Sequence, residues 1–167
     1  PSVTLPPERT LEAARVLAQA AGAQGMVGGQ VLDMAGEGHA MGLTEVEELQ
    51  RLKTGALIRA AAEMGCVLAG GSEEQRKAVC RYAERIGLAF QIQDDILDVV
   101  GDEATLGKPV GSDAKSEKNT FVTLKGLEEC RHLVEKLTEE AVEALSIFGD
   151  EGDSLCWLAR SLASREK

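Results

Sequence analysis

The sequence predicts an all-α protein, folded as a bundle of helices. Aromatic residues make up only 3% of its 167 residues, so the core must be built from Ala, Leu, Val and Ile. Long stretches rich in Ala, Leu, Glu and Lys are interrupted by few turn residues, which is typical of helices. No segment shows a convincing strand pattern. The length suits a single helical domain over residues 1–167.

The first half of the chain predicts three helices. The two prolines at positions 6 and 7 mark a helix start, and the helix should continue for about four turns to near Gly22. The Gly-rich stretch GMVGGQVLDMAGEG lacks the spacing of a phosphate-binding loop, so we expect a close-packed helix with loose ends. Thr44 and Glu47 have the spacing of a capping box. A long helix to about Ala69 should follow.

The second half predicts three more helices and one long connection. Ser72 and Gln75 form a second capping box, opening a helix that should reach about Val100. Residues 101–120 contain three Gly and one Pro, and a connection of this length in a compact domain is usually functional or disordered. The stretches LKGLEECRHLVEKLTEEAVEALSIF and SLCWLARSLASREK predict a long helix and a short final one.

The composition excludes several classes of protein. A net charge of −10 makes the chain a poor general binder of nucleic acid or of an anionic membrane, and suits cations or anions that arrive with cations. No long uninterrupted apolar run predicts a membrane span, and no signal peptide is seen. The four cysteines are widely scattered, which argues against a zinc site and fits a reducing, cytoplasmic location. The start at Pro1 rather than Met fits a chain that lacks its natural beginning.

The stretch FQIQDDILDVVG places three carboxylates, Asp94, Asp95 and Asp98, among large apolar side chains. On a helical wheel, the apolar residues of 82–100 cover roughly 220°, too wide an arc for a surface helix. We therefore expect this helix to end inside the protein, with its polar stripe facing a cavity or a bay. Like charges repel there, and Mg²⁺ shared with a substrate phosphate would relieve the repulsion. The alternative is a solvated acidic face on an ordinary helix.

Two lysines fit the same interpretation. Lys53 lies on the preceding helix, and Lys108 lies in the Gly-rich connection after the acidic stretch. Two lysines near a metal–carboxylate cluster would together bind a diphosphate. Taken alone, each lysine has the simpler interpretation of a solvated surface residue.

The segments LKTGALIRAA and YAERIGLAFQIQDDILDVVGDEATLGKPVGSDAKSEKNT together resemble the all-trans short-chain prenyl diphosphate synthases. The resemblance is greatest to the bacterial farnesyl diphosphate synthases, also called geranyltranstransferases. It runs from about Gln24 to Leu145, and the closing Arg165-Glu166-Lys167 is similar to the basic ending of many members. It implies the C-terminal portion of an isoprenoid-synthase-type helical bundle.

The resemblance also implies a reaction. In that family an allylic diphosphate, dimethylallyl or geranyl, ionises with the help of three Mg²⁺ ions. Isopentenyl diphosphate then attacks the cation to give farnesyl or geranylgeranyl diphosphate, and the released diphosphate is the usual candidate for the base. Neither His39 nor His132 is expected to act. By the match of motifs, the resemblance implies that Asp94 binds the metal directly, and that Asp95 and Asp98 bind it through water. It implies diphosphate binding by Lys53, Lys108 and Lys118. It also implies catalytic roles for Lys53, Thr54 and Gln91.

The sequence also departs from the family. The first aspartate-rich motif and the arginines that bind isopentenyl diphosphate are missing, typical members approach twice this length, and Phe121-Val122 stands where many have Tyr-Pro. We interpret the chain as the C-terminal part of a larger synthase, inactive alone, that forms a homodimer or associates with the missing N-terminal half. The alternatives are a non-catalytic helical partner subunit of a prenyl diphosphate synthase and a plain acidic bundle without a ligand.

Overall fold

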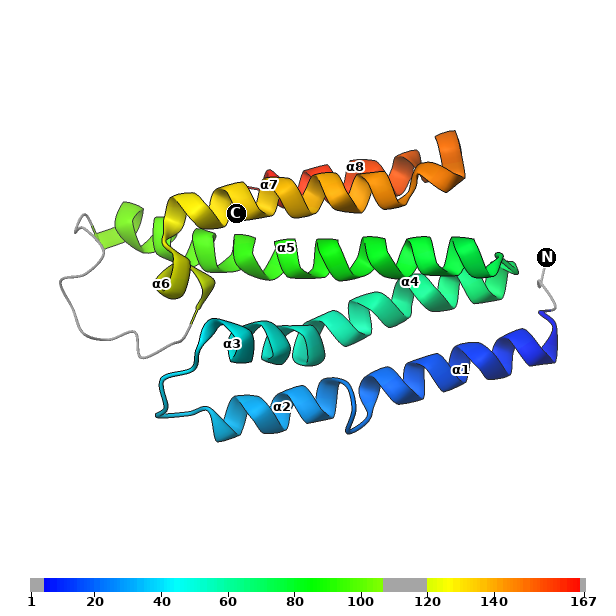
Figure 1. Cartoon of the computed structure of the whole chain (residues 1–167), viewed down its shortest axis with the longest axis horizontal. Helices are drawn as coiled ribbons and strands as arrows, with labels where there is room; N and C mark the ends of the chain where they lie inside the picture. Colours follow the sequence, from blue (N-terminus) through cyan, green and yellow to red (C-terminus); the bar gives the residue numbers. More distant parts are fainter. Residues whose placement is uncertain (1–4, 107–119, 166–167) are drawn as a thin grey trace.

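The computed structural model describes residues 5–106 and 120–165, and every element in these ranges is helical, as predicted (Figure 1). The elements are α1 (Pro7–Ala21), α2 (Met26–Ala35), α3 (Leu43–Gln50), the π-helical segment η1 (Arg51–Gly55), α4 (Ala56–Ala69), α5 (Glu73–Leu106), α6 (Phe121–Lys125), α7 (Leu127–Ala144), the 3₁₀ segment η2 (Ser146–Gly152) and α8 (Asp153–Ala163).

The helices form an antiparallel bundle around α5, the longest of them (Figure 1). Helix α4 packs on one side of α5, and α7 and α8 pack on another. Helix α1 packs on α4, while α2 packs on η1 and α3, so α1 and α2 together make an outer layer. Segments α3, η1 and α4 run without a break and antiparallel to α5.

The helix ends confirm one predicted capping box and correct another. The Ser72 N–H donates to Gln75 Oε1 at 2.8 Å, and the Gln75 N–H donates to Ser72 Oγ at 3.2 Å, as predicted. The box predicted at Thr44 is wrong, because α3 begins at Leu43 and the Gly42 N–H donates to Glu45 Oε2 at 2.8 Å. Helix α5 also continues to Leu106, well past the expected end near Val100.

The main core lies between α5 and α7, and its residues recur every three or four positions on both helices. This spacing places them on one face of each helix, so the two faces interlock along their length. Phe121 of α6 is fully buried against this core. The buried residues with this spacing are Val79, Tyr82, Ile86, Ala89, Ile92 and Ile96 on α5, and Cys130, Val134, Leu137 and Ala141 on α7.

A charged network joins α1, α4 and α5. Glu63 of α4 is buried and accepts hydrogen bonds from Arg76 of α5, at 2.5 and 2.8 Å. It also pairs with Arg59 at 2.9 Å. Arg76 reaches Glu12 of α1 at 2.9 Å, and hydrogen bonds from Arg15 and then Arg76 lower the pKa of Glu12 to about 2. Two guanidinium groups therefore compensate the burial of Glu63, which would be costly if it were unpaired.

All four cysteines are free thiols. Cys80 and Cys130 are buried, and burial raises the pKa of the Cys80 thiol to about 11. Within the described ranges, no helix has both the length and the apolar character that a membrane span requires.

Candidate functional site

The acidic residues lie on the second half of α5, which is helical through this region as predicted. Gln91, Asp94, Asp95 and Asp98 are spaced three or four apart and therefore line one side of the helix. The sequence predicts that this side faces a cavity or a bay, and in the structure Gln91, Asp94 and Asp95 are half-buried. Asp98 is exposed, and the Asp94 side chain is 42% exposed.

The three carboxylates have different surroundings. Asp95 Oδ2 accepts a hydrogen bond from the Phe121 N–H at 2.8 Å and so anchors the first residue of α6 on α5. Asp94 Oδ1 accepts a hydrogen bond from Arg165 Nη2 near the C-terminus. Asp98 forms no hydrogen bond or ion pair with the described residues. Asp95 thus has a structural bond that the sequence did not suggest.

Lys53 lies in the π-helical segment η1, and π-helical turns are frequent at functional sites. Helix α2 contacts this lysine at two points. A Cβ placed on Gly29 would lie 2.3 Å from the Lys53 backbone N, so only glycine allows α2 to approach this closely. One turn further on, Asp33 Oδ2 accepts a hydrogen bond from Lys53 Nζ at 2.6 Å. The sequence alone assigned no role to Asp33. Its i, i+4 spacing from Gly29, which places both residues on one face of α2, was the signal available in the sequence.

The close approach of η1 to α5 brings the predicted residues into one region. A Cβ on Gly87 would lie 3.8 Å from Gly55 Cα, so the two segments meet at a pair of glycines. Thr54 and Lys53 directly precede Gly55. Gln91 follows Gly87 by one turn. Because the two segments run antiparallel, Lys53 and Thr54 lie on the same side of this contact as Gln91 and the aspartates (Figure 1). Thr54 and Gln91 are half-buried.

Lys108 and Lys118, which the sequence also predicts to bind diphosphate, lie outside the described residues.

Among the described residues, no group of three or more His, Cys, Asp or Glu is arranged to hold a metal ion. The three aspartates therefore do not form a ready-made cluster. Mg²⁺ often binds through one or two carboxylates and completes its shell with waters and substrate phosphates. Asp94 and Asp98, one turn apart on α5, supply hard oxygen ligands of this kind. One oxygen of Asp94 is bonded to Arg165, and one oxygen of Asp95 is bonded to the Phe121 N–H.

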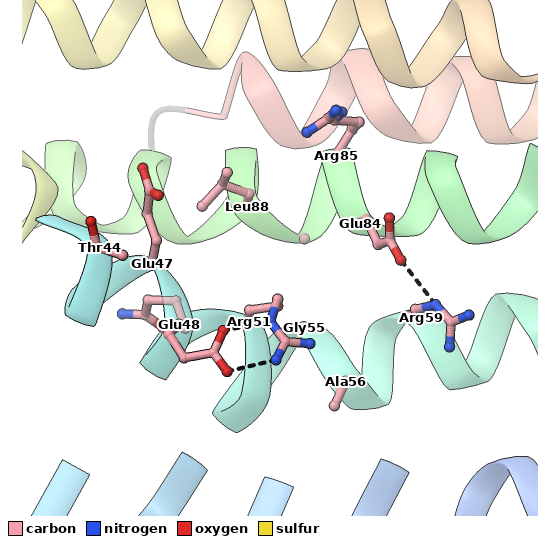
Figure 2. A pocket seen from close by; sticks show the side chains of 12 residues that line it. Thr44, Glu47, Glu48, Arg51, Gly55, Ala56, Arg59, Glu84, Arg85 and Leu88 are labelled. Carbon is pink, nitrogen blue, oxygen red and sulfur yellow. Dashed lines mark hydrogen bonds and ion pairs between the residues drawn. The ribbon is translucent and has the colours of Figure 1, made fainter. Parts of the chain in front are cut away.

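A separate cavity of about 500 Å³ lies between the α3–η1–α4 segment and α5 (Figure 2). Two of the ion pairs of the structure lie on its walls. Glu48 pairs with Arg51 at 2.6 Å, and Glu84 pairs with Arg59 at 3.0 Å. None of the predicted site residues that the structure describes lines it. The side of α5 that carries Gln91 and the aspartates therefore does not face this cavity.

Comparisons with known proteins agree with the arrangement of the helices. A farnesyl diphosphate synthase of Escherichia coli (strain K12) is 48% identical over 136 residues, which are 81% of this chain and 46% of that protein. Geranylgeranyl pyrophosphate synthase 11, chloroplastic, of Arabidopsis thaliana is 42% identical over 163 residues, 95% of this chain and 46% of that protein.

A solved structure shares the fold. The geranyltransferase of Helicobacter pylori, solved in complex with magnesium and isoprenyl diphosphate, superposes with a TM-score of 0.74 at 33% identity. The match covers 95% of this chain and 52% of that chain. The chain spans about half the length of the curated relatives it matches. Residues 4–148 match the family described as polyprenyl synthetase. This chain, with its isoprenoid-synthase helical fold, therefore belongs to the polyprenyl synthetase family.

Proposed function

We propose that this chain is the part of a prenyl diphosphate synthase that carries the second aspartate-rich motif and binds the diphosphate of the allylic substrate. The observation that carries the proposal is the contact between η1 and α5 at Gly55 and Gly87. This contact brings the Lys53–Thr54 segment alongside the part of α5 that carries Gln91 and the aspartates. In the proposal, the Lys53 ammonium and these carboxylates act on one diphosphate.

Each residue has a distinct role in the proposal. Lys53 Nζ is an ammonium with three N–H donors, one of which is used by Asp33. The remaining donors bind the diphosphate and stabilise its negative charge as the C–O bond to the allylic carbon breaks. Mg²⁺ held by Asp94 directly and by Asp98 through bound water would neutralise the same leaving group. Thr54 and Gln91 flank the developing allylic cation. Asp95 acts on the metal only through water, and Lys108 and Lys118 add positive charge around the diphosphate.

The substrates proposed are dimethylallyl or geranyl diphosphate together with isopentenyl diphosphate, and the product is farnesyl or geranylgeranyl diphosphate. Relatives named for both products match this chain. Because the sequence lacks the first aspartate-rich motif, we propose that these residues act only with a further segment or subunit that supplies it. The complete enzyme would be a cytoplasmic homodimer that uses three Mg²⁺ ions.

Thermal unfolding tests the binding part of the proposal. A ligand that binds only the folded state raises its stability, by about 2.7 kcal/mol at a hundred times its Kd. For a chain of this size such a gain corresponds to a rise of about 5–10 °C in the melting temperature. We expect this rise when Mg²⁺ and inorganic diphosphate are added together. It should be lost in the double variant Asp94→Asn/Asp98→Asn.

The matched control is Asp150→Asn, which removes an exposed carboxylate from η2, away from the site. This variant should keep the full rise. The proposal is wrong if the wild-type chain shows no rise, or if the double variant and the control respond equally.

An activity assay tests the second part. The purified chain, supplied with geranyl diphosphate, labelled isopentenyl diphosphate and Mg²⁺, is expected to form little or no prenyl product. Robust product formation would show that these residues need no partner segment. It would contradict the proposal that a further segment or subunit must supply the first aspartate-rich motif.

A further inference from the structure

Arg165, the last described residue, contacts three residues of one face of α5. Its Nη2 donates to Asp94 Oδ1, and its guanidinium carbon lies 4.3 Å from the centroid of the Phe90 ring. Its backbone carbonyl accepts a hydrogen bond from Gln93 Nε2 at 3.1 Å. Phe90, Gln93 and Asp94 have the i, i+3, i+4 spacing of one helix face. The C-terminal segment after α8 is therefore attached to the acidic part of α5 by three different kinds of contact.

The ion pair involves a carboxylate that the proposed function assigns to Mg²⁺. The Arg165 side chain is only 25% exposed, so its charge is held close to Asp94 rather than free in solvent. A guanidinium bound to Asp94 Oδ1 occupies one metal-binding oxygen and repels a second cation brought to the same carboxylate. Arg165 and Mg²⁺ therefore compete for Asp94.

The contact is also incomplete, which favours its release. Arg165 Nε is buried and has no hydrogen-bond partner among the described residues. A buried donor without a partner costs part of the free energy that the other contacts supply. A cation that takes Asp94 would free this nitrogen to bind water. The contact of Arg165 with α5 is therefore stable only while no cation binds Asp94 more tightly than Arg165 does.

We propose that Arg165 is a built-in competitor of the metal: it holds the C-terminal segment on α5 while Asp94 is metal-free, and Mg²⁺ binding releases it. This inference rests on the proposed function, because it takes Asp94 as a metal ligand. Metal occupancy and the position of the C-terminal segment are then two aspects of one equilibrium, and each must affect the other by the same factor.

Metal affinity is the first test. The dissociation constant of Mg²⁺ is measured by titration calorimetry on the whole 167-residue chain, with and without inorganic diphosphate. Arg165→Gln should bind Mg²⁺ about tenfold more tightly than the wild type, which corresponds to about 1.4 kcal/mol. The control Arg160→Gln removes the same charge from an exposed position on α8, and should change the constant less than about twofold. Gln93→Ala keeps every charge but removes the bond to the Arg165 carbonyl. It should strengthen binding by about threefold.

Mobility of the C-terminal segment is the second test, and it does not depend on activity. Heteronuclear NOE values of the Ser164 and Arg165 amides should be high in the metal-free chain and should fall on saturation with Mg²⁺. In Arg165→Gln they should be low from the start.

The outcomes separate this inference from the proposed function. Suppose Mg²⁺ binds and Asp94→Asn weakens it, while Arg165→Gln behaves like Arg160→Gln and the Arg165 amide stays rigid. The competition is then wrong, and the proposed function stands. If neither the wild type nor Arg165→Gln binds Mg²⁺, with or without diphosphate, Asp94 is not a ligand, and both proposals are overturned.

Discussion

Replacing Gly29 with alanine should disturb the packing that holds Lys53. The added Cβ would lie 2.3 Å from the Lys53 backbone N and 2.6 Å from its Cα, where ordinary contacts are 3.4–4 Å. Helix α2 and η1 would therefore have to separate by about 1 Å. The atoms that clash belong to the backbone, so they cannot rotate out of the way as a side chain would.

The expected cost follows from two opposing terms. Overpacking a close contact costs about 1–3 kcal/mol, and a backbone clash belongs at the upper end of that range. Exchanging glycine for alanine within a helix contributes about 1 kcal/mol in the opposite direction. The balance is a loss of about 2 kcal/mol. For a chain of this length it corresponds to a fall of about 4–8 °C in the melting temperature.

Urea unfolding followed by circular dichroism measures this loss, with Gly65→Ala as the matched control. Gly65 is an exposed residue within α4, and a Cβ there would have no neighbour within 4 Å. The control should therefore gain about 0.5–1 kcal/mol. If Gly29→Ala also gains stability, α2 does not pack against η1 as closely as described, and the contact of α2 with Lys53 is wrong.

Three further predictions concern the core and the charged network. Phe121→Ala should lower the free energy of unfolding by about 3–5 kcal/mol, because the ring is fully buried. The control Leu124→Ala, at a 41% exposed position of the same helix, should lower it by about 1 kcal/mol. Equal losses would mean that α6 does not pack on the core. Tyr82→Phe should cost about 1 kcal/mol in urea unfolding, because the hydroxyl donates to the Leu155 carbonyl at 2.9 Å; an unchanged midpoint would contradict that bond. The pKa of Glu12 is lowered from 4.5 to about 2, chiefly by its hydrogen bond from Arg15. The contribution of Glu12 to folding stability is therefore complete above pH 4.5 and is lost as the pH falls toward 2. Unfolding midpoints measured across that range should decline less in Glu12→Gln than in the wild type, and identical pH profiles would refute the assignment.

Local patterns in the sequence were sufficient to predict much of the fold. Helix content, the cap at Ser72 and the position of the carboxylates along one side of α5 depend on residues within a few positions of one another. On the helical wheel of residues 82–100, Gln93 is a polar residue that falls among the apolar positions. Its amide reaches the Arg165 carbonyl, which is far along the chain.

The contacts that define the candidate site could not be predicted in the same way. Asp33 meets Lys53, and Asp95 meets the Phe121 amide, across separations of 20 and 26 residues. No local periodicity encodes such pairs. The exposure of Asp98 was also missed, because a wide apolar arc does not say which neighbouring element covers each part of it. The cap at Gly42 was missed because Gly42–Glu45 and Thr44–Glu47 have the same spacing.

The π-helical segment has a consequence for chain length. A π turn closes a ring one residue larger than an α turn, so it accommodates one residue more without rotating the helices on either side. Deleting one residue between Arg51 and Gly55 should therefore leave α3 and α4 in their present orientation, as one uninterrupted α-helix. What would change is the outward bulge of the main chain against α2. A natural variant shorter by one residue here would be expected to fold normally but to present its lysine at a different angle.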